Sequence, residues 1–489
     1  MEDQAKLRFH SPKGMTRYEI PPVPTSDARF RPGVTSITEA ARETKVLCEA
    51  DVVVVGGGPG GISAALAAAR SGARVVLLER FGHLGGMSTG GLVNIIPHMT
   101  TIDGTQWIGG ICHEFIQRLQ RQDAAFAPAP SEWGSTQPDV LKYYRDSNFF
   151  HFFIRKNRVG EDALIYTAIL DPEIAKNELN RMAAEAGIKL LLHSLVTDVI
   201  MEGNRVRGII FESKSGRQAV LGKVVIDGSG DGDLLSRSGT ESEDEIDPGL
   251  RIANLCFGYW IGNVDFRAYD RYVSSRPEDY ARMMIEMQQR GLYMSFFRGM
   301  LKNRQDSAWL HPHFKTNCQT DVEEMTRMDV AAREKAVQTW EMLRDHADGF
   351  QNSYIELTCP QLGTTGGRRL IGCASLREAD LKRTEPYADT IAVFPNNDRG
   401  ADCADYPIVY APYGAIVPKK TEGLLVACRA FSSDDEANSC FNLIPHCMCL
   451  GQAAGIAAAI AVKHDIPVRA VDYAELKAEL IAQGALLPR

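Results

Sequence analysis

The chain alternates between short apolar runs and glycine-rich polar stretches, and its first strong run is residues 52–55, four consecutive valines. Such a β-branched run is too apolar for a surface strand and predicts a central strand of a parallel sheet. Residues 62–71 are mostly Ala, Leu and Ile and stop before Gly72, which predicts a buried helix. Residues 74–78 predict a second buried strand. This order indicates a βαβ unit in an α/β domain.

Later segments extend this pattern. Asp171-Pro-Glu173 predicts the start of a helix through residue 186, and a long apolar helix is predicted to begin near Ile444. The capping box Thr320-x-x-Glu323 predicts a helix through about residue 346. A further helix is predicted at 278–289, and strands are predicted at 189–193, 195–200, 206–212, 218–220, 224–226, 353–358, 391–394 and 423–428.

Changes of composition along the chain predict its domains. Residues 1–49 are polar and rich in proline, which indicates an extended arm along the rest of the molecule or along a second subunit. Residues 50–240 and 416–489 are predicted to form one domain, with an excursion at 101–170 that covers the site. Residues 241–415 are predicted to be an inserted α+β substrate domain. Ligand pockets favour domain interfaces, so we expect the substrate between the two.

The turn after the valine run carries the first candidate site. Gly56, Gly58 and Gly61 fit Gly-x-Gly-x-x-Gly, in which the glycines allow a tight turn, close approach to a pyrophosphate and helix–strand packing. Glu79 ends the second strand, 23 residues after Gly56, close to the spacing of an acid that binds a ribose hydroxyl. The plain alternative is a glycine-rich turn in an ordinary βαβ unit. Strand, turn, helix, strand and acid in order favour a dinucleotide site.

Two more glycine-rich stretches extend this site. Residues 80–91 contain five glycines, which a nucleotide alone does not need, and therefore favour a longer cofactor, FAD rather than NAD. Residues 227–233 form an acidic, glycine-rich turn after a strand. Cofactor contact is the preferred interpretation of that turn, because no glutamate follows at the spacing of a calcium loop.

Charge and composition exclude several function classes. The chain has 489 residues and a net charge of −8, which argues against a nucleic-acid partner or an anionic membrane. We see neither an uninterrupted membrane span nor an apolar leader segment, and the eleven cysteines show no Cys-x-x-Cys, so a cytoplasmic location is expected. Only one complete glycine motif is present, so no separate NADPH domain is expected.

Together these motifs resemble the FAD-dependent oxidoreductase family, flavoproteins of the glutathione-reductase-like, two-domain kind. The resemblance implies a GR-type, Rossmann-like three-layer domain that binds FAD. It rests on residues 52–61 with Glu79, 84–91, 171–173, 226–234, Pro412-Tyr413, 424–429 and 444–455, in this order along the chain.

The resemblance also implies roles for individual residues. Gly56, Gly58, Pro59, Gly60 and Gly61 would surround the pyrophosphate, and Glu79 would bind the adenosine ribose. Gly85, Gly86 and Met87 would follow the chain toward the isoalloxazine, and Val196 would lie near the adenine. Asp231 and Arg429 would lie near the ribityl and phosphate region, and the helix that begins at Ile444 would point its N-terminus at the flavin N1–C2=O edge. Arg80, Gly230 and Leu443 are expected as further cofactor contacts.

Two departures from the family concern the substrate. Thr365-Gly-Gly-Arg-Arg369 stands where the family often has Arg-Glu-Ser-Arg-Arg, and Gly414 replaces an arginine after Pro-Tyr. Both changes would enlarge or neutralise part of the substrate cavity.

His446 is the first candidate base, because the predicted helix N-terminus would keep its imidazole neutral beside the flavin. A capping or packing role is the alternative. His98 follows the glycine-rich loop and could line the cavity or tether the flavin, and the alternative is a hydrogen-bonded loop histidine. Arg368 would bind a substrate carboxylate or brace its loop. Tyr413 would form a cavity wall or pack at the domain interface. His311-Pro-His313 lacks nearby metal ligands and is interpreted as surface, and no metal site is expected.

The sequence thus predicts an FAD-dependent oxidoreductase that oxidises an alcohol or amine carbon of a small organic substrate. Hydride would pass to the flavin N5, and the electrons would then pass to dioxygen or an external acceptor. A tRNA-modifying flavoprotein, an NAD-dependent dehydrogenase and a non-catalytic cofactor-binding protein are the alternatives. Homo-oligomerisation stays open.

Overall fold

The computed structural model describes residues 36–146, 150–293, 295–299, 301–316, 318–397 and 405–488. Most of the predicted N-terminal arm, residues 1–35, lies outside the described residues. The last residues of the predicted arm, 45–49, are part of a strand instead, because β1 runs over Lys45–Val55.

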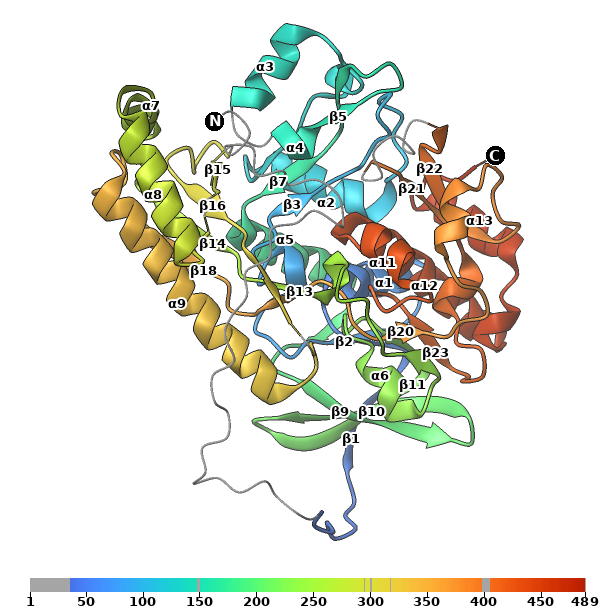
Figure 1. The fold of residues 1–489 in the computed structure, drawn as a ribbon. Helices are drawn as coiled ribbons and strands as arrows, with labels where there is room; N and C mark the ends of the chain where they lie inside the picture. Colours follow the sequence, from blue (N-terminus) through green and yellow to red (C-terminus); the bar gives the residue numbers. More distant parts are fainter. Residues whose placement is uncertain are drawn as a thin grey trace.

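The largest sheet of the described residues has seven strands and lies in the lower half of the view in Figure 1; it is called the central sheet below. Its parallel part has the order β8 (Lys189–Leu191), β2 (Val75–Leu78), β1, β11 (Gly216–Asp227) and β23 (Leu424–Val426). The antiparallel hairpin β9 (Leu195–Glu202) and β10 (Arg205–Ser213) joins it along the first half of β11. The predicted α/β class and the βαβ unit are thereby confirmed.

One difference from the prediction concerns β11. The sequence predicts two separate strands at 218–220 and 224–226, but one strand runs through Gly222 and ends at Asp227. Almost its whole length pairs with β1, from Lys45–Gln218 to Val55–Asp227. The continuous ladder with β1 holds Gly222 in the strand, although glycine by itself weakens one.

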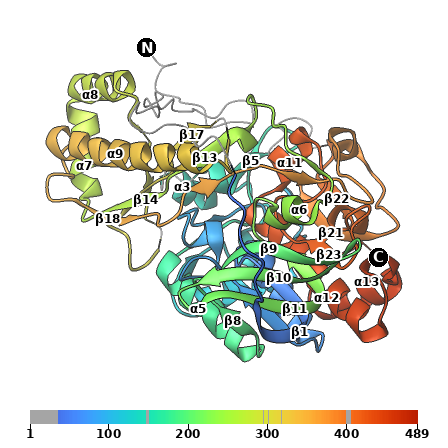
Figure 2. The same ribbon diagram turned by 90° about the horizontal axis from the view of Figure 1, so that it is seen from below.

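The valine run of β1 is buried on both faces of the sheet. Val52 and Val54 point into one apolar core, and Val53 and Val55 point into another. The first core holds α1 (Pro59–Arg70), α2 (Gly110–Gln120), α5 (Pro172–Glu185) and α12 (Ile444–His464). The second includes residues of β9, β10 and α6 (Asp233–Ser238). Figure 2 shows β9, β10 and β11 side by side from below.

Helices α1 and α12 touch backbone to backbone. A Cβ on Gly451 would lie 2.0 Å from the carbonyl oxygen of Gly60, and one on Gly455 would lie 2.1 Å from that of Ala64. Only glycine fits at such contacts, so the small residues of α12 set how closely the two helices pack.

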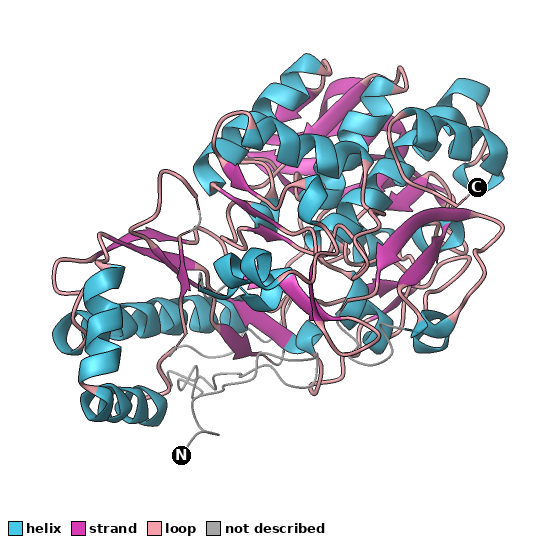
Figure 3. Cartoon of the chain, turned by 90° about the horizontal axis from the view of Figure 1, so that it is seen from above, coloured by secondary structure: helices cyan, strands magenta, loops and turns pink. Residues whose placement is uncertain are grey.

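A third core lies on the other side of the molecule (Figure 1). One of its sheets has the order β15 (Phe297–Arg298), β16 (Ala308–Leu310), β14 (Tyr259–Gly262) and β18 (Tyr354–Thr358). A second has the order β17 (His313–Lys315), β13 (Asn254–Cys256) and β19 (Gly363–Thr364). Helices α7 (Phe266–Ser275), α8 (Pro277–Gln289) and α9 (Val322–His346) gather at one end, away from the larger group of helices (Figure 3).

The start of α9 differs from the predicted capping box by one residue. Asp321, not Thr320, is the N-cap, and its carboxylate accepts a hydrogen bond of 2.8 Å from the backbone N–H of Glu324. Aspartate and threonine are both good N-caps, so the sequence alone left the register open.

The segments predicted as excursion and substrate domain are divided between the cores. Residues 255–359 pack in the third core together with Leu92, Ile95 and residues from 141 to 169. Residues 376–417 pack against α12 in the first core. The predicted domain boundaries themselves stay a prediction.

The remaining elements are short. They are β3 (Ile95–Ile96), β4 (Ala125–Phe126), α3 (Pro138–Asp146), α4 (Phe150–Phe153), β5 (Ile154–Lys156), β6 (Asp162–Leu164), β7 (Ala168–Leu170), β12 (Ser242–Glu243), β20 (Arg369–Leu370), β21 (Thr390–Pro395), β22 (Ile408–Pro412), α11 (Asp435–Phe441) and α13 (Tyr473–Ala482).

Among the helices of the described ranges, α12 alone has the length and apolar composition of a membrane span. The most apolar 18-residue window of α12 is 94% buried inside the protein, as in the core helix of a globular fold.

Candidate functional site

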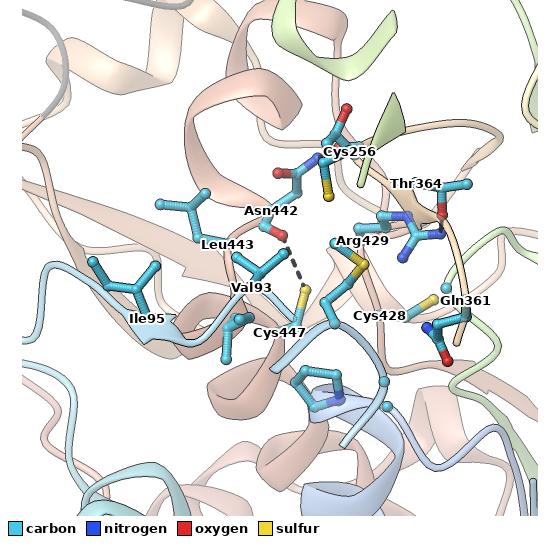
Figure 4. Close-up of a pocket in the computed structure, with 18 of the residues that line it drawn as sticks. Val93, Ile95, Cys256, Gln361, Thr364, Cys428, Arg429, Asn442, Leu443 and Cys447 are labelled. Carbon is cyan, nitrogen blue, oxygen red and sulfur yellow. Dashed lines mark hydrogen bonds between the residues drawn. The ribbon is translucent and has the colours of Figure 1, made fainter. Parts of the chain in front are cut away.

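A cavity opens where β1 and β11 end, between the central sheet and the third core (Figure 4). Its lining comes from segments far apart in the sequence, and these meet because the parallel strands end at the same edge of the sheet. The lining residues come from the segments 58–60, 79–81, 86–98, 152–155, 228–231, 251–256, 311–313, 361–365, 428–429 and 439–447, together with Tyr293 and Phe297.

The N-terminus of α1 forms one end of the cavity. Gly58 is its N-cap, no side chain caps the helix, and its first turn has no acid. Gly58, Pro59 and Gly60 line the cavity. Unpaired N–H groups at a helix N-terminus, with its partial positive charge, favour a phosphate group.

Gly56 and Gly61 lie behind this turn rather than in the cavity wall. Gly56 has a φ of +95°, and a Cβ there would lie 2.5 Å from the carbonyl oxygen of Gly228. A Cβ on Gly61 would lie 1.8 Å from the carbonyl oxygen of Gly56. These two glycines therefore shape the turn, whereas Gly58 and Gly60 present backbone to the cavity.

Glu79 lies in the cavity wall and is fixed by two backbone groups. Its carboxylate accepts hydrogen bonds from the N–H of Gly57 at 2.7 Å and from that of Phe81 at 2.8 Å. Burial raises the pKa of Glu79, and these hydrogen bonds partly oppose that effect. The carboxylate thus ties the glycine turn to the end of β2.

The N-terminus of α12 lines the same cavity. Leu443 is its N-cap without a side-chain cap, and Leu443, Ile444 and Cys447 face the cavity. Its first turn also lacks an acid. Two uncapped, partly positive helix N-termini on one cavity fit a dinucleotide with a pyrophosphate at one and the N1–C2=O edge of a flavin at the other.

Arg429 supports the same fit. Its guanidinium donates to Asp231 Oδ1 at 2.5 Å and to the hydroxyl of Thr364, which lies beside it (Figure 4). Its Nε is buried and has no hydrogen-bond partner in the described part of the chain. A buried donor of this kind is costly unless a bound group accepts from it. The residues present therefore fit FAD.

The structure places most of the predicted cofactor residues in this wall. Those that line the cavity are Gly58, Pro59, Gly60, Glu79, Arg80, Gly86, Met87, Gly230, Asp231, Arg429, Leu443 and Ile444. Gly56, Gly61, Gly85 and Val196 are outside the lining. Val196 is buried in the core beneath β9, and Gly85 has a φ of +97° in the loop before Gly86.

His98 is the one predicted catalytic candidate in the cavity lining. It is buried, and its φ of +60° is a strained value for a residue other than glycine. Its Nε2 lies 3.1 Å from Nη2 of Arg155. An arginine can only donate, so Nε2 accepts, and a neutral His98 ring carries its proton on Nδ1.

His446 does not line the cavity. It is 0% exposed, and its ring packs 4.5 Å from that of Phe394 and 5.4 Å from that of Phe441, measured between centroids. Although His446 lies in the first turn of α12, it faces the core, because β21 packs on that side of the helix. This placement fits the packing role that the sequence left as an alternative.

Arg368 and Tyr413 also lie outside the lining. Arg368 pairs with Asp244 at 2.9 Å and donates to the carbonyl of Gly232, so it braces its loop. The hydroxyl of Tyr413 donates to the carbonyl of Val468 at 2.7 Å, and the ring is buried. Both have the structural role that the sequence left as an alternative.

Two of the three carboxylates in the acidic turn at 227–233 are engaged by other protein groups. Asp227 accepts from the N–H groups of Ser229 and Leu234 and from the Ser229 hydroxyl, and Asp231 pairs with Arg429. The described ranges hold no group of three His, Cys, Asp or Glu residues that could bind a metal ion.

The interpretation of His311-Pro-His313 as surface was wrong. Both histidines line the cavity, with ring centroids 4.6 Å apart, and His311 stacks on Trp309 at 5.2 Å. The signal was present, since His311 follows the apolar triplet Ala308–Leu310 that forms β16. Cys256, Cys428 and Cys447 also reach the cavity (Figure 4). Cys428 and Cys447 lie next to the predicted contacts Arg429 and Ile444 in the sequence, which is a signal that could have placed them.

The model of the family named FAD dependent oxidoreductase matches residues 51–480. The chain belongs to this family. Its cofactor is FAD, and its α/β fold with a parallel sheet is the FAD-binding Rossmann type.

Known relatives cover part of the chain. Digeranylgeranylglycerophospholipid reductase 2 of Methanothermobacter thermautotrophicus is 27% identical over 44% of this chain and 47% of its own length. Thiamine thiazole synthase of Methanococcus vannielii is 25% identical over 45% of this chain and 72% of its own length. The chain thus matches only about half the length of the reductase.

A geranylgeranyl bacteriochlorophyll reductase-like protein from Thermoplasma acidophilum is a similar solved structure, with 15% identity over 89% of this chain and 83% of that chain and a TM-score of 0.40. Flavin-dependent brominase Bmp2 is 15% identical over 89% of this chain and 83% of that chain, with a TM-score of 0.39.

Proposed function

We propose that the protein oxidises an alcohol or amine carbon of a small organic substrate. The observation that carries this proposal is the lining of the cavity. Beside the two helix N-termini, the lining includes the apolar side chains of Val93, Ile95, Phe152, Phe297 and Leu362. A cavity that holds the cofactor and also has apolar walls can keep a substrate next to the redox ring and away from water.

Bound FAD would supply two-electron redox chemistry, and dioxygen or an external acceptor would take the electrons onward. The residues of the chain would bind the cofactor and orient the substrate. Gly58, Gly60 and Arg429 would hold the dinucleotide, and the N-terminus of α12 would place partial positive charge at the flavin edge. His98, whose Nε2 accepts from Arg155, would form part of the wall beside the substrate.

The experiment that tests this proposal is anaerobic reduction of the yellow holoenzyme. A panel of alcohols, amines, hydroxy acids and sugars is added, and the visible flavin absorbance is followed. We expect at least one class to bleach the flavin and to yield the carbonyl or imine product. A panel that leaves the spectrum unchanged would contradict the proposal.

A reductase is the second candidate, because the relatives include proteins named reductases. The chemically reduced enzyme would then regain its flavin colour in the absence of oxygen when an unsaturated lipid is added.

The family favours FAD over the NAD alternative. A gel shift with tRNA tests the RNA-modifying alternative. Cytoplasmic location and oligomeric state stay predictions.

A further inference from the structure

The charges that line the cavity are divided unequally. Its two carboxylates, Glu79 and Asp231, both lie with the dinucleotide cradle, where backbone N–H groups and Arg429 engage them. The described lining from the third core has no carboxylate but includes Arg251 with His311 and His313. This part of the cavity therefore favours an anion.

The side chain of Arg251 is bound to residues just before the N-terminus of α12. Its guanidinium donates to the carbonyl of Ser439, from Nε at 3.0 Å and from Nη2 at 2.7 Å, and to the side-chain oxygen of Asn442. Asn442 directly precedes Leu443, the N-cap of α12. The positive charge of Arg251 and the partial positive charge of the helix N-terminus thus act at the same place.

His311 lies within the electrostatic reach of Arg251. Burial and the Arg251 charge lower the pKa of His311 to about 4, so its imidazole is neutral near pH 7. Its stacking on Trp309 fixes the ring plane. A neutral imidazole can donate a hydrogen bond through one nitrogen.

Two polar atoms beside Arg251 have no partner. His311 Nε2 and Ser439 Oγ are buried, and neither makes a hydrogen bond within the described part of the chain. A buried polar atom without a partner destabilises the protein unless a ligand or water satisfies it. Both residues line the cavity.

We propose that Arg251, His311 and Ser439 form a subsite for the carboxylate of an organic acid. The guanidinium would bind the anion, and His311 Nε2–H and the Ser439 hydroxyl would donate to its oxygens. The nearby walls, Phe152, Phe297 and Leu362, are apolar, so the body of the acid is aromatic or aliphatic. This assignment rests on the proposed function in one respect, that the bound acid is the substrate.

The test is equilibrium binding to the oxidised holoenzyme by calorimetry, which needs no turnover. Benzoate and phenylacetate are the probes, and benzamide is the neutral analogue of benzoate. We expect benzamide to bind about tenfold or more weakly than benzoate, as for loss of a charged hydrogen bond. Arg251→Gln should weaken benzoate by a similar factor, and Ser439→Ala and His311→Asn by less.

The controls separate binding from folding and from cofactor loss. Arg282→Gln removes the same charge from the exposed face of α8 and should leave benzoate binding unchanged. Arg251→Lys keeps the charge and should bind benzoate with intermediate affinity. FAD content, from the ratio of visible to ultraviolet absorbance, should stay at the wild-type level in all variants.

Three outcomes would overturn the proposal. The first is equal binding of benzoate and benzamide, and the second is no binding of either acid by the wild type. The third is that Arg251→Gln loses FAD in proportion to its loss of benzoate affinity, which would show that the three residues bind the cofactor instead. Failure of the proposed oxidation is distinguishable, because the flavin would then stay unbleached while benzoate still bound.

Discussion

Asp227 ends β11 with its carboxylate fully buried beneath the cofactor cradle. Three hydrogen bonds from Ser229 and Leu234 hold it there. Burial is nevertheless the larger effect and raises the pKa of Asp227 to about 6. The folded protein keeps a proton here in a pH range in which the unfolded chain has released it.

The contribution of Asp227 to the unfolding free energy should therefore fall as the pH rises from 4 to 6. The folded pKa of about 6 against an ordinary 3.8 corresponds to about 3 kcal/mol from this group. Asp227→Asn should remove that part of the slope in urea denaturation measured at several pH values. Asp139→Asn, at an exposed position, should keep the wild-type slope. Parallel curves for Asp227→Asn and the wild type would refute this assignment.

Individual side chains show where sequence reasoning reached its limit. The glycine turn, Glu79 and the Asp171 cap follow from local rules, and the structure has them. Whether His446 or His311 faces the cavity depends on partners far away in the chain, Phe394 for one and Arg251 for the other. No spacing along a single helix or strand contains that information.

At the scale of elements, the contact between α1 and α12 decides the geometry of the cofactor site, which lies between the N-termini of these two helices. Both helices begin at the cavity, and their glycine contacts fix the distance between the two N-termini. The small residues of α12, such as Gly451 and Gly455, were visible in the sequence. Which helix would lie against α12 was not, because the two are separated by most of the chain.

Gly451→Ala tests this contact. The added Cβ would lie 2.0 Å from the carbonyl oxygen of Gly60, so the helices must separate. We expect a loss of about 1–3 kcal/mol in the unfolding free energy, as for overpacked cores, together with weaker FAD binding. Denaturation of the apoprotein and fluorescence titration with FAD give the two values.

Gly58→Ala is the matched control. The same methyl group would meet only the carbonyl oxygen of Gly228, at 3.9 Å. Stability of the apoprotein should stay within about 0.5 kcal/mol of the wild type. FAD should bind more weakly, because Gly58 lines the cavity. If Gly451→Ala proves as stable as Gly58→Ala, the contact does not set the helix spacing.

At the scale of the whole molecule, a buried ion pair joins the central domain to the third core. Arg304 Nε donates to Asp171 Oδ2 at 2.9 Å, and the same guanidinium pairs with Glu356 of β18. Asp171 also caps α5 through its other oxygen, Oδ1. One carboxylate thus serves a local role that the sequence revealed and a long-range role that it did not.

Asp171→Asn separates the two roles. Asparagine can keep the Oδ1 acceptor for α5 but loses the charge that faces Arg304. Because Arg304 keeps its pair with Glu356, we expect a loss of about 1–3 kcal/mol in urea denaturation, as for one lost partner of a buried hydrogen bond. Glu173→Gln removes an exposed carboxylate two residues away and should have little effect. Equal stability of the two variants would show that the pair contributes nothing.

The three cavity thiols have a consequence for the lifetime of the enzyme in air. Burial raises the pKa of Cys256 and of Cys447 to about 12 and raises that of Cys428 as well. Peroxide attacks the thiolate, and these sulfurs stay protonated at neutral pH. If dioxygen takes the electrons, hydrogen peroxide forms beside these three thiols. Because the thiols are protonated, they react slowly with peroxide, and we expect repeated turnover in air to leave them as free thiols rather than sulfenic acids.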